Sequence, residues 1–313
     1  MKNIRIIFMG TPKFSCSVLN MLIDNHFNVV AVVTQPDKCV GRKKVLQASP
    51  IKELANKHNI DVIQPINIKE NACEVLEYKP DLVITCAYGQ IIAKSILEYP
   101  KYKCINVHAS LLPKYRGGAP IHHAIINGEK ETGITIMHMI DKMDAGDILV
   151  QKSIPIEKED TTNSMFDKLS LLGSELLLEI LPDYINGLIK PIEQDISKVT
   201  YAYNISRDDE YINFNRDVIK VYNNIRGLIS WPVGYSIINN MKIKIHQADY
   251  ILGDNSIPSK VYGYENDGIK VGAINGYIII KQLQLAGKNV VKAREFYNGY
   301  SSRMEGYLFN EQE

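Results

Sequence analysis

The sequence predicts an α/β protein, with a doubly wound, mostly parallel sheet followed by a small antiparallel β-barrel. Through the first half of the chain, short runs of apolar, β-branched residues alternate with helical patterns. That alternation is typical of a parallel sheet covered by helices on both faces. The last hundred residues instead carry short strand patterns separated by pairs that favour tight turns. The length of 313 residues fits two domains.

The amino-terminal part begins with an expected strand at 4–9 and an expected helix at 11–25. Val18, Leu19 and Leu22 fall on one face of that helix. In sheets of this class, ligands bind at the carboxyl ends of the strands. The other expected strands are 29–34, 61–63, 81–85, 104–108, 133–140 and 148–156, and the other expected helices are 51–59, 71–79, 119–127 and 161–187.

The carboxyl-terminal part is predicted from hairpin signals. Periodicity fades over 190–206, which we interpret as a linker between a domain at 1–189 and a domain at 207–313. Asn and Gly tolerate the positive φ of tight hairpin turns, so several short antiparallel strands and a small barrel are expected. The strand patterns cover 236–248, 260–264, 269–272 and 277–285, and the turn signals are Asn239-Asn240, Asn266-Asp267-Gly268 and Asn275-Gly276.

Composition argues against several classes of protein. Hydrophobic residues make up 45% and charged residues 23% of the chain, as in an ordinary globular protein. There is no apolar run of transmembrane length and no secretory signal at the start, so a cytoplasmic location is expected. The five cysteines form no C-x-x-C pair, so neither a zinc site nor a disulfide framework is indicated. The net charge of +1 means that any RNA contact must depend on local patches.

The strand at 104–108 ends in candidate catalytic residues. Asn106 and His108 are two residues apart, so they share one face of the strand at its carboxyl end. An amide donor beside an imidazole suits acyl transfer, because the amide stabilises an oxyanion and the imidazole moves a proton. The segment 141–147 adds three carboxylates, among them Asp144, which would orient the histidine. From the residues alone, a structural histidine and a turn of self-bonded aspartates remain open alternatives.

Two other segments near the start are candidates for phosphate binding. Only Gly10 follows the first strand, so the G-x-G-x-x-G fingerprint is absent and a tight turn is the preferred interpretation. The segment 35–50 carries Lys38, Arg42, Lys43 and Lys44 without apolar periodicity, and reads as an exposed basic loop. The segment is either a charged loop that only contacts solvent or a loop that binds phosphate groups.

A set of longer motifs runs along nearly the whole chain. The start has FMGTPKF and TQPDK, the middle has PDLVITCAYGQII and INVHASLLPKYRGGAPIHHAIINGEKETGITIMHM followed by MDAGDIL, and the end has IRGLISWPVGY, KQLQLAGK and REFYNG. In these motifs the chain resembles the methionyl-tRNA formyltransferase family. The basic loop departs from the family by continuing as Lys43-Lys44-Val45-Leu46, where members usually carry a further glycine.

The resemblance implies a fold, a reaction and a set of residues. Residues 1–189 would form a formyltransferase-type, Rossmann-like catalytic domain, and residues 207–313 an OB-like barrel that binds tRNA. Asn106, His108 and Asp144 match the family's catalytic trio. Contacts to the folate are implied for Ser110, Leu111, Leu112, Pro113, Tyr88, Gly89, Gln90 and Ile91, and contacts to the tRNA for Arg42, Lys43 and Lys44.

The implied reaction transfers the formyl group of 10-formyltetrahydrofolate to the α-amine of initiator methionyl-tRNA, without a metal, and so supports translation initiation. The chain is expected to act as a monomer, with no membrane partner. An enzyme that formylates a nucleotide-linked amino sugar, with the same amino-terminal domain, is the alternative within the enzyme class. A non-catalytic RNA-binding protein is the alternative from another class. The many tyrosines of the barrel would suit RNA binding, whereas its small net charge argues against it.

Overall fold

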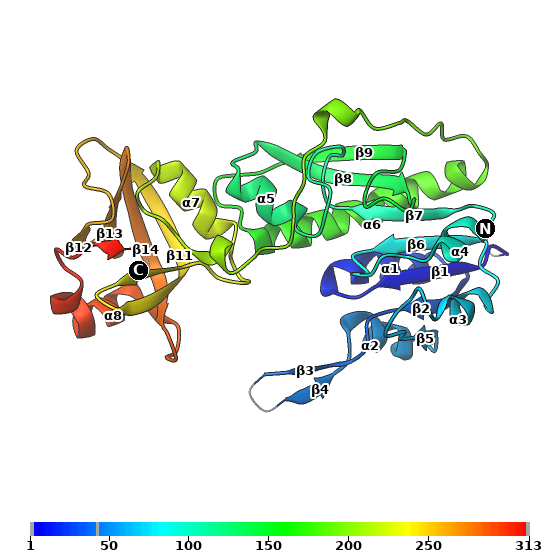
Figure 1. Ribbon diagram of the computed structural model, residues 1–313, viewed down its shortest axis with the longest axis horizontal. Coiled ribbons are helices and arrows are strands. Elements are labelled where there is room, and N and C mark those ends of the chain that lie inside the picture. Colours follow the sequence, from blue (N-terminus) through cyan, green and yellow to red (C-terminus); the bar gives the residue numbers. More distant parts are fainter. Residues whose placement is uncertain (1–2, 42–43, 311–313) are drawn as a thin grey trace. The chain divides into compact units, whose positions relative to one another are not determined.

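The computed structural model describes residues 3–41 and 44–310, which group into two compact units (Figure 1). The first unit comprises Met1–Pro120, Glu131–Pro155 and Phe166–Tyr203, and the second comprises Ile121–Lys130, Ile156–Met165 and Asn204–Glu313. Of the expected linker at 190–206, residues 190–203 therefore group with the first unit and residues 204–206 with the second. Two short segments expected in the amino-terminal domain group with the second unit.

The first unit is built on a seven-stranded sheet in which six strands run in one direction and β8 runs against them. The central strands β1 and β6 are buried along their whole length, as expected for strands covered on both faces. This sheet matches the predicted doubly wound, mostly parallel fold. In spatial order the strands are β5 (Asp61–Ile63), β2 (Val29–Val33), β1 (Ile6–Gly10), β6 (Leu82–Cys86), β7 (Cys104–His108), β8 (Glu131–His138) and β9 (Ile148–Pro155).

Helices cover this sheet through apolar side chains. Val75 of α3 and Ile96 of α4 pack in one core cluster with Ile7 and Val83 of the central strands. The helix α6 comes so close to β7 that a Cβ at Gly173 would lie 2.9 Å from the Val107 side chain. The helices of this unit are α1 (Cys16–Asp24), preceded by the 3₁₀ turn η1 (Lys13–Ser15), then α2 (Pro50–Lys57), α3 (Ala72–Leu76), α4 (Lys94–Glu98), most of α6 (Thr162–Ile185) and the 3₁₀ turn η2 (Ile196–Lys198).

The basic segment that was expected to be a loop forms a β-hairpin. Strands β3 (Lys38–Val40) and β4 (Val45–Gln47) pair antiparallel, with Cys39 opposite Leu46. The prediction missed them because three-residue strands give no usable periodicity. Val45 and Leu46 are exposed on β4, and Lys44 is exposed beside them. The predicted tRNA contacts Arg42 and Lys43 lie outside the described residues.

The second unit contains an antiparallel sheet in the order β12-β13-β14-β11-β10-β16. Both edges of this sheet contact the same segment: Val261 of β12 accepts from Gly306 and donates to Tyr307, while Ile238 of β10 pairs with Phe309. The sheet therefore closes on itself, as predicted for a small barrel. Its strands are β10 (Tyr235–Ile238), β11 (Met241–Leu252), β12 (Val261–Glu265), β13 (Gly268–Ala273), β14 (Gly276–Leu285), β15 (Val291–Lys292) and β16 (Phe309–Asn310).

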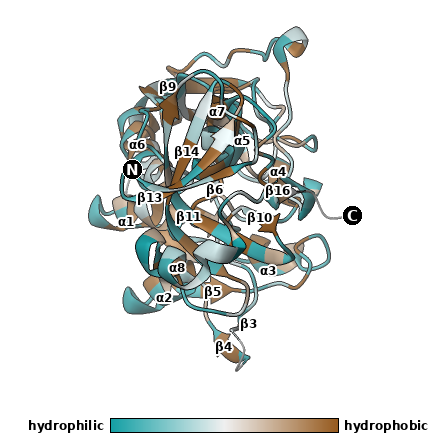
Figure 2. Cartoon of the chain, turned by 90° about the vertical axis from the view of Figure 1, so that its left-hand side faces the viewer, coloured by the Kyte–Doolittle hydropathy of each residue, from teal (hydrophilic) through white to brown (hydrophobic). Residues whose placement is uncertain are grey.

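Helices also pack in the second unit, and two of them were not predicted. The helix α7 (Val218–Arg226) is capped by the Asp217 side chain and buries Val218, Val221 and Ile225 against the barrel core. The helix α8 (Ala293–Tyr300) buries Ala293 and Phe296 and carries both hydrophilic and hydrophobic stretches (Figure 2). The remaining helical elements are α5 (Pro120–Ile126) and the 3₁₀ turns η3 (Asp208–Glu210) and η4 (Ser301–Arg303). None of the helices in the described ranges is long and apolar enough to cross a membrane.

Candidate active site

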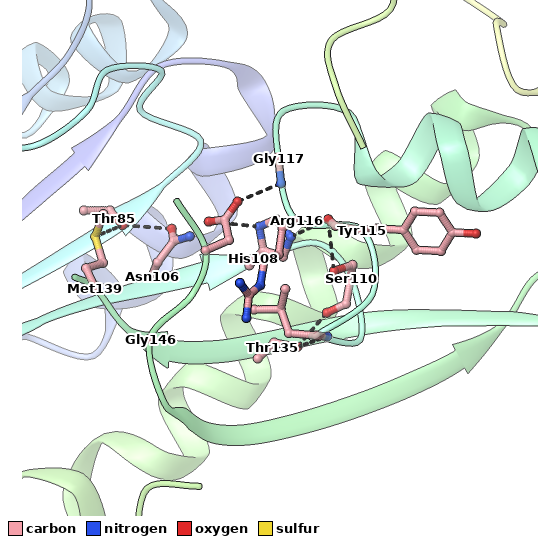
Figure 3. A network of polar contacts seen from close by, with 12 residues as sticks. Thr85, Asn106, His108, Ser110, Tyr115, Arg116, Gly117, Thr135, Met139 and Gly146 are labelled. Carbon is pink, nitrogen blue, oxygen red and sulfur yellow. Dashed lines mark hydrogen bonds and ion pairs between the residues drawn. The ribbon is translucent and has the colours of Figure 1, made fainter. Parts of the chain in front are cut away.

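Strand β7 carries the first two site residues at its carboxyl end, next to β6 and β8 (Figure 3). Asn106 is half-buried and the His108 side chain is 6% exposed. Their spacing of two residues places them on the same side of the strand, as the sequence predicted. The residue between them, Val107, is buried and packs against α6 on the opposite face.

The orientation of the Asn106 amide is set by its neighbour on β6. Thr85 is paired with Asn106 across the sheet, and its hydroxyl donates a 2.8 Å hydrogen bond to Oδ1 of Asn106. Because this oxygen accepts a bond, the amide nitrogen lies on the other side. Nδ2 of Asn106 makes no hydrogen bond to any other residue that the structure describes, so it is available to a ligand.

The two nitrogens of His108 face different acceptors. Nε2 lies 3.0 Å from the carbonyl oxygen of Tyr115, which can only accept, so this nitrogen carries a hydrogen. Nδ1 lies 3.6 Å from Oδ1 of Asp144. That distance exceeds a normal N–H···O hydrogen bond, so Nδ1 and the carboxylate face each other without a direct hydrogen bond. The Nδ1 edge is therefore the side of the ring where a proton can be exchanged.

The carboxylate of Asp144 is bound by a loop on the side that faces away from His108. The backbone N–H of Gly117 donates a 2.8 Å hydrogen bond to Oδ2 of Asp144, whose side chain is 14% exposed. One carboxylate oxygen is thus fixed by the loop and the other faces the imidazole. The structure brings together the three residues that the sequence motifs nominated, although Asp144 comes from a different segment of the chain.

Two glycines allow the loops around Asp144 to close. Gly117 has φ +125°, and a Cβ there would lie 2.5 Å from the carbonyl oxygen of Ala202. At Gly146 a Cβ would lie 2.0 Å from the carbonyl oxygen of His138. Side chains cannot fit at such distances, so both positions require glycine for packing, and Gly117 also requires it for its positive φ.

The segment 110–113, predicted to contact the folate, is tied down mainly through its backbone. The Thr135 hydroxyl donates to the Ser110 carbonyl at 2.6 Å and accepts from the Leu112 N–H at 3.1 Å. The Ser110 hydroxyl turns inward to the Lys114 carbonyl, and Leu112 is also buried. Leu111 and Pro113 are half-buried and are the side chains of this segment that remain accessible to a ligand.

The segment 88–91, the other predicted folate contact, is partly core and partly surface. Tyr88 is buried in the core cluster beside α3 and α4, and its hydroxyl has no partner within the described residues. Burial raises the pKa of Tyr88 to about 12. Gln90 accepts from the backbone of Ile68, whereas Gly89 and Ile91 are exposed. Ile91 is therefore the apolar side chain of this segment that a ligand can reach.

The structure adds residues that the sequence motifs did not nominate. Thr85 orients the Asn106 amide, and the Gly117 N–H donates to the Asp144 carboxylate. Gln194 donates to the backbone carbonyls of Asp144 and Gly146. Gln194 lies in the stretch interpreted as a linker, where no periodicity marked it. No group of three or more His, Cys, Asp or Glu side chains suited to a metal ion occurs among the residues described.

Comparison with known proteins adds family information to this geometry. The formyl transferase family profile matches residues 2–181, and the profile of the formyl transferase C-terminal domain matches residues 204–301. Methionyl-tRNA formyltransferase of Bacillus cytotoxicus is 49% identical over 300 residues, which cover 95% of this chain and 96% of that protein. The chain belongs to the methionyl-tRNA formyltransferase family. Another member, from Bacillus subtilis, is 47% identical over 94% of both proteins.

Solved structures share the fold of this formyltransferase at lower identity. The sugar 3N-formyltransferase WlaRD, solved with dTDP and 5-N-formyl-THF, matches with a TM-score of 0.67 and 24% identity over 91% of this chain and 99% of that one. An N-formyltransferase from Helicobacter canadensis, in complex with folinic acid and dTDP-3-aminofucose, matches with a TM-score of 0.68 and 22% identity over 88% and 98%. The family to which the chain belongs uses folate-based formyl donors.

Proposed function

We propose that Asn106, His108 and Asp144 carry out the transfer of a formyl group from 10-formyltetrahydrofolate to the α-amine of initiator methionyl-tRNA. The observation that supports these roles is the meeting of a free amide donor, an imidazole and a carboxylate at the end of β7. Membership of the methionyl-tRNA formyltransferase family, over 95% of the chain, supports the proposed reaction and both proposed substrates.

In the proposed reaction the neutral α-amine attacks the formyl carbon. An α-amine has a pKa near 8, so a useful fraction is neutral at pH 7. A new bond forms between the amine nitrogen and the formyl carbon, and the bond from that carbon to N10 of the folate then breaks. The proton released by the amine passes to N10. Atoms and charges balance without a metal or an oxidant.

The site residues would act on the oxygen of the tetrahedral intermediate and on the proton. Nδ2 of Asn106 would donate to the oxyanion, an interaction that typically contributes about 3–4 kcal/mol of transition-state stabilisation. His108 would share the proton at Nδ1, its side towards Asp144, because Nε2 is held by the Tyr115 carbonyl. Asp144 would stabilise the positive charge that develops on the imidazole.

The segments on either side of the trio supply candidate contacts to the two substrates. We assign the folate to the surface that includes Leu111, Pro113 and Ile91, which are the accessible apolar side chains of the two predicted folate segments. For the tRNA, Lys44 on the β3–β4 hairpin is exposed and suitably charged, and phosphate contacts of this kind weaken as salt rises. A monomeric state and a cytoplasmic location remain predictions.

The acceptor can be tested directly. Purified protein would be given labelled 10-formyltetrahydrofolate with methionyl-tRNA, or with a dTDP-linked amino sugar as the matched control acceptor. Label is expected to move to methionyl-tRNA at a kcat/KM at least about a hundredfold higher than to the sugar. Preferential labelling of the sugar would contradict the proposal.

A further inference from the structure

Gln194 is a buried polar side chain in a stretch that otherwise faces solvent. Its side chain is 5% exposed, while Glu193 and Asp195 on either side are exposed. The stretch belongs to the first unit by its contacts, since Ile192 pairs with Ile148 and Tyr201 pairs with Arg116. It lies between the ranges matched by the two family profiles, 2–181 and 204–301.

Four hydrogen bonds use the whole bonding capacity of the Gln194 amide. Nε2 donates to the carbonyl oxygen of Asp144 at 2.9 Å and to that of Gly146 at 2.7 Å. Oε1 accepts from Nε of Arg116 at 3.1 Å and from Nη2 of Arg116 at 2.7 Å. Carbonyls only accept and a guanidinium only donates, so these partners allow a single orientation of the amide.

These bonds connect the two segments that hold the catalytic carboxylate. On one side is the Asp144 turn, and on the other is Arg116, whose neighbour Gly117 donates to the Asp144 carboxylate. Asp144 has φ +49°, a conformation that costs a non-glycine residue free energy and persists only where its surroundings hold it. The Gln194 amide supplies that restraint through its bonds to the turn, and the buried Arg116 guanidinium holds the amide in place.

We propose that Gln194 is a positioning residue, which holds the Asp144 turn against the Arg116–Gly117 segment and so keeps the carboxylate 3.6 Å from Nδ1 of His108. This inference rests on the proposed role of Asp144. Small misplacements of catalytic groups can reduce rates about a hundredfold, so loss of the Gln194 contacts is expected to reduce kcat by about tenfold or more. The KM values for both substrates should change little, because Gln194 touches neither predicted substrate surface.

A double-mutant cycle separates positioning from general structural support. Gln194→Ala is measured in the natural protein and in an Asp144→Asn background. If Gln194 acts through the carboxylate, the substitution lowers kcat about tenfold or more in the first background and less than about threefold in the second. A purely structural role would give the same factor in both backgrounds, and that result would overturn the inference.

A second variant distinguishes loss of positioning from loss of folded protein. Gln194→Glu keeps the volume and the acceptor for Arg116, but it removes both N–H donors to the turn. It is expected to lower kcat as Gln194→Ala does, while the protein still unfolds in one cooperative transition, at a lower thermal midpoint because the carbonyls of Asp144 and Gly146 lose their donor. Glu193→Gln, the exposed neighbour, is the matched control and should keep full kcat.

The outcomes also separate this inference from the proposed function. Full activity in Gln194→Glu would overturn the positioning role even if Asp144→Asn is strongly impaired. Full activity in Asp144→Asn would instead contradict the proposed role of Asp144, on which the positioning depends. A loss of kcat in Gln194→Glu that is absent in Glu193→Gln and shrinks in the Asp144→Asn background would support both.

Discussion

The hydroxyl of Thr85 donates a 2.8 Å hydrogen bond to Oδ1 of Asn106, across the neighbouring strands β6 and β7. The register pairs these residues directly, so the contact is a product of the sheet itself. In this arrangement the oxygen of the Asn106 amide has a donor and its nitrogen has no partner among the described residues. With the oxygen occupied, the NH₂ group is the end presented to a reacting carbonyl.

Replacement of Thr85 by Val should therefore weaken catalysis without removing a catalytic group. Val keeps the shape of Thr but lacks the hydroxyl, so the Asn106 amide loses its fixed orientation and its oxygen loses a donor. We expect kcat for formyl transfer to fall about tenfold. Thr85→Ser, which keeps the hydroxyl, is the control and should retain most of the activity. An equal fall in kcat in Thr85→Val and Thr85→Ser would show that the hydroxyl does not orient the Asn106 amide.

The turn that carries Asp144 should be sensitive to any side chain at Gly146. A Cβ there would lie 2.0 Å from the carbonyl oxygen of His138, so Gly146→Ala must displace backbone. Forcing atoms into packed space typically costs about 1–3 kcal/mol, and we expect a loss of that size in the free energy of unfolding in urea, with a fall in kcat.

The matched control for that substitution is Gly299→Ala. Gly299 lies on the exposed side of α8, and a Cβ there would meet nothing within 4 Å. Alanine is the better helix former, so this variant should be as stable as the natural protein or slightly more stable. A Gly146→Ala protein as stable as Gly299→Ala would contradict the close approach of the turn to His138.

Tyr88 should make stability depend on pH in the alkaline range. Its buried hydroxyl has no partner within the described part of the chain, and burial raises the pKa of Tyr88 to about 12. The phenol ionises near pH 10 in the unfolded chain. Its contribution to stability is therefore full below pH 10 and is lost as pH rises from about 10 to about 12, by about 2 kcal/mol.

Tyr88→Phe isolates this contribution. At pH 7 the variant should be at least as stable as the natural protein, because it removes a buried hydroxyl without a partner. Above pH 10 it should keep stability that the natural protein loses. Urea unfolding at pH 7 and at pH 11 gives the comparison. Parallel losses in both proteins would mean that Tyr88 does not ionise on unfolding in this range.

Several elements of the fold could be predicted because local chemistry decides them. The turns at Asn239-Asn240 and Asn266-Asp267 have positive φ throughout, as their residue types indicated. The buried strands β1 and β6 are apolar except for Thr85. The helix α7 was not predicted, although its buried apolar residues Val218, Val221, Tyr222 and Ile225 follow a helical period, because strand patterns are frequent in the last hundred residues.

The site was only partly predictable, for a physical reason. Asn106 and His108 share a strand, so their spacing fixed their common face. Asp144 reaches His108 only through tertiary structure, and its nomination came from motif resemblance. Gln194 sits in a stretch of polar sequence without periodicity, where a buried amide and an exposed one look alike. Only its four hydrogen bonds to Arg116, Asp144 and Gly146 distinguish it from an exposed amide.

The most direct test of the central claim is transfer of labelled formyl to methionyl-tRNA by the natural protein, beside His108→Ala and Asn106→Ala. The account predicts robust transfer by the natural protein and a fall in kcat of about a hundredfold or more in each variant, with folate binding retained. Full activity in His108→Ala would contradict the assignment of the catalytic site to the end of β7.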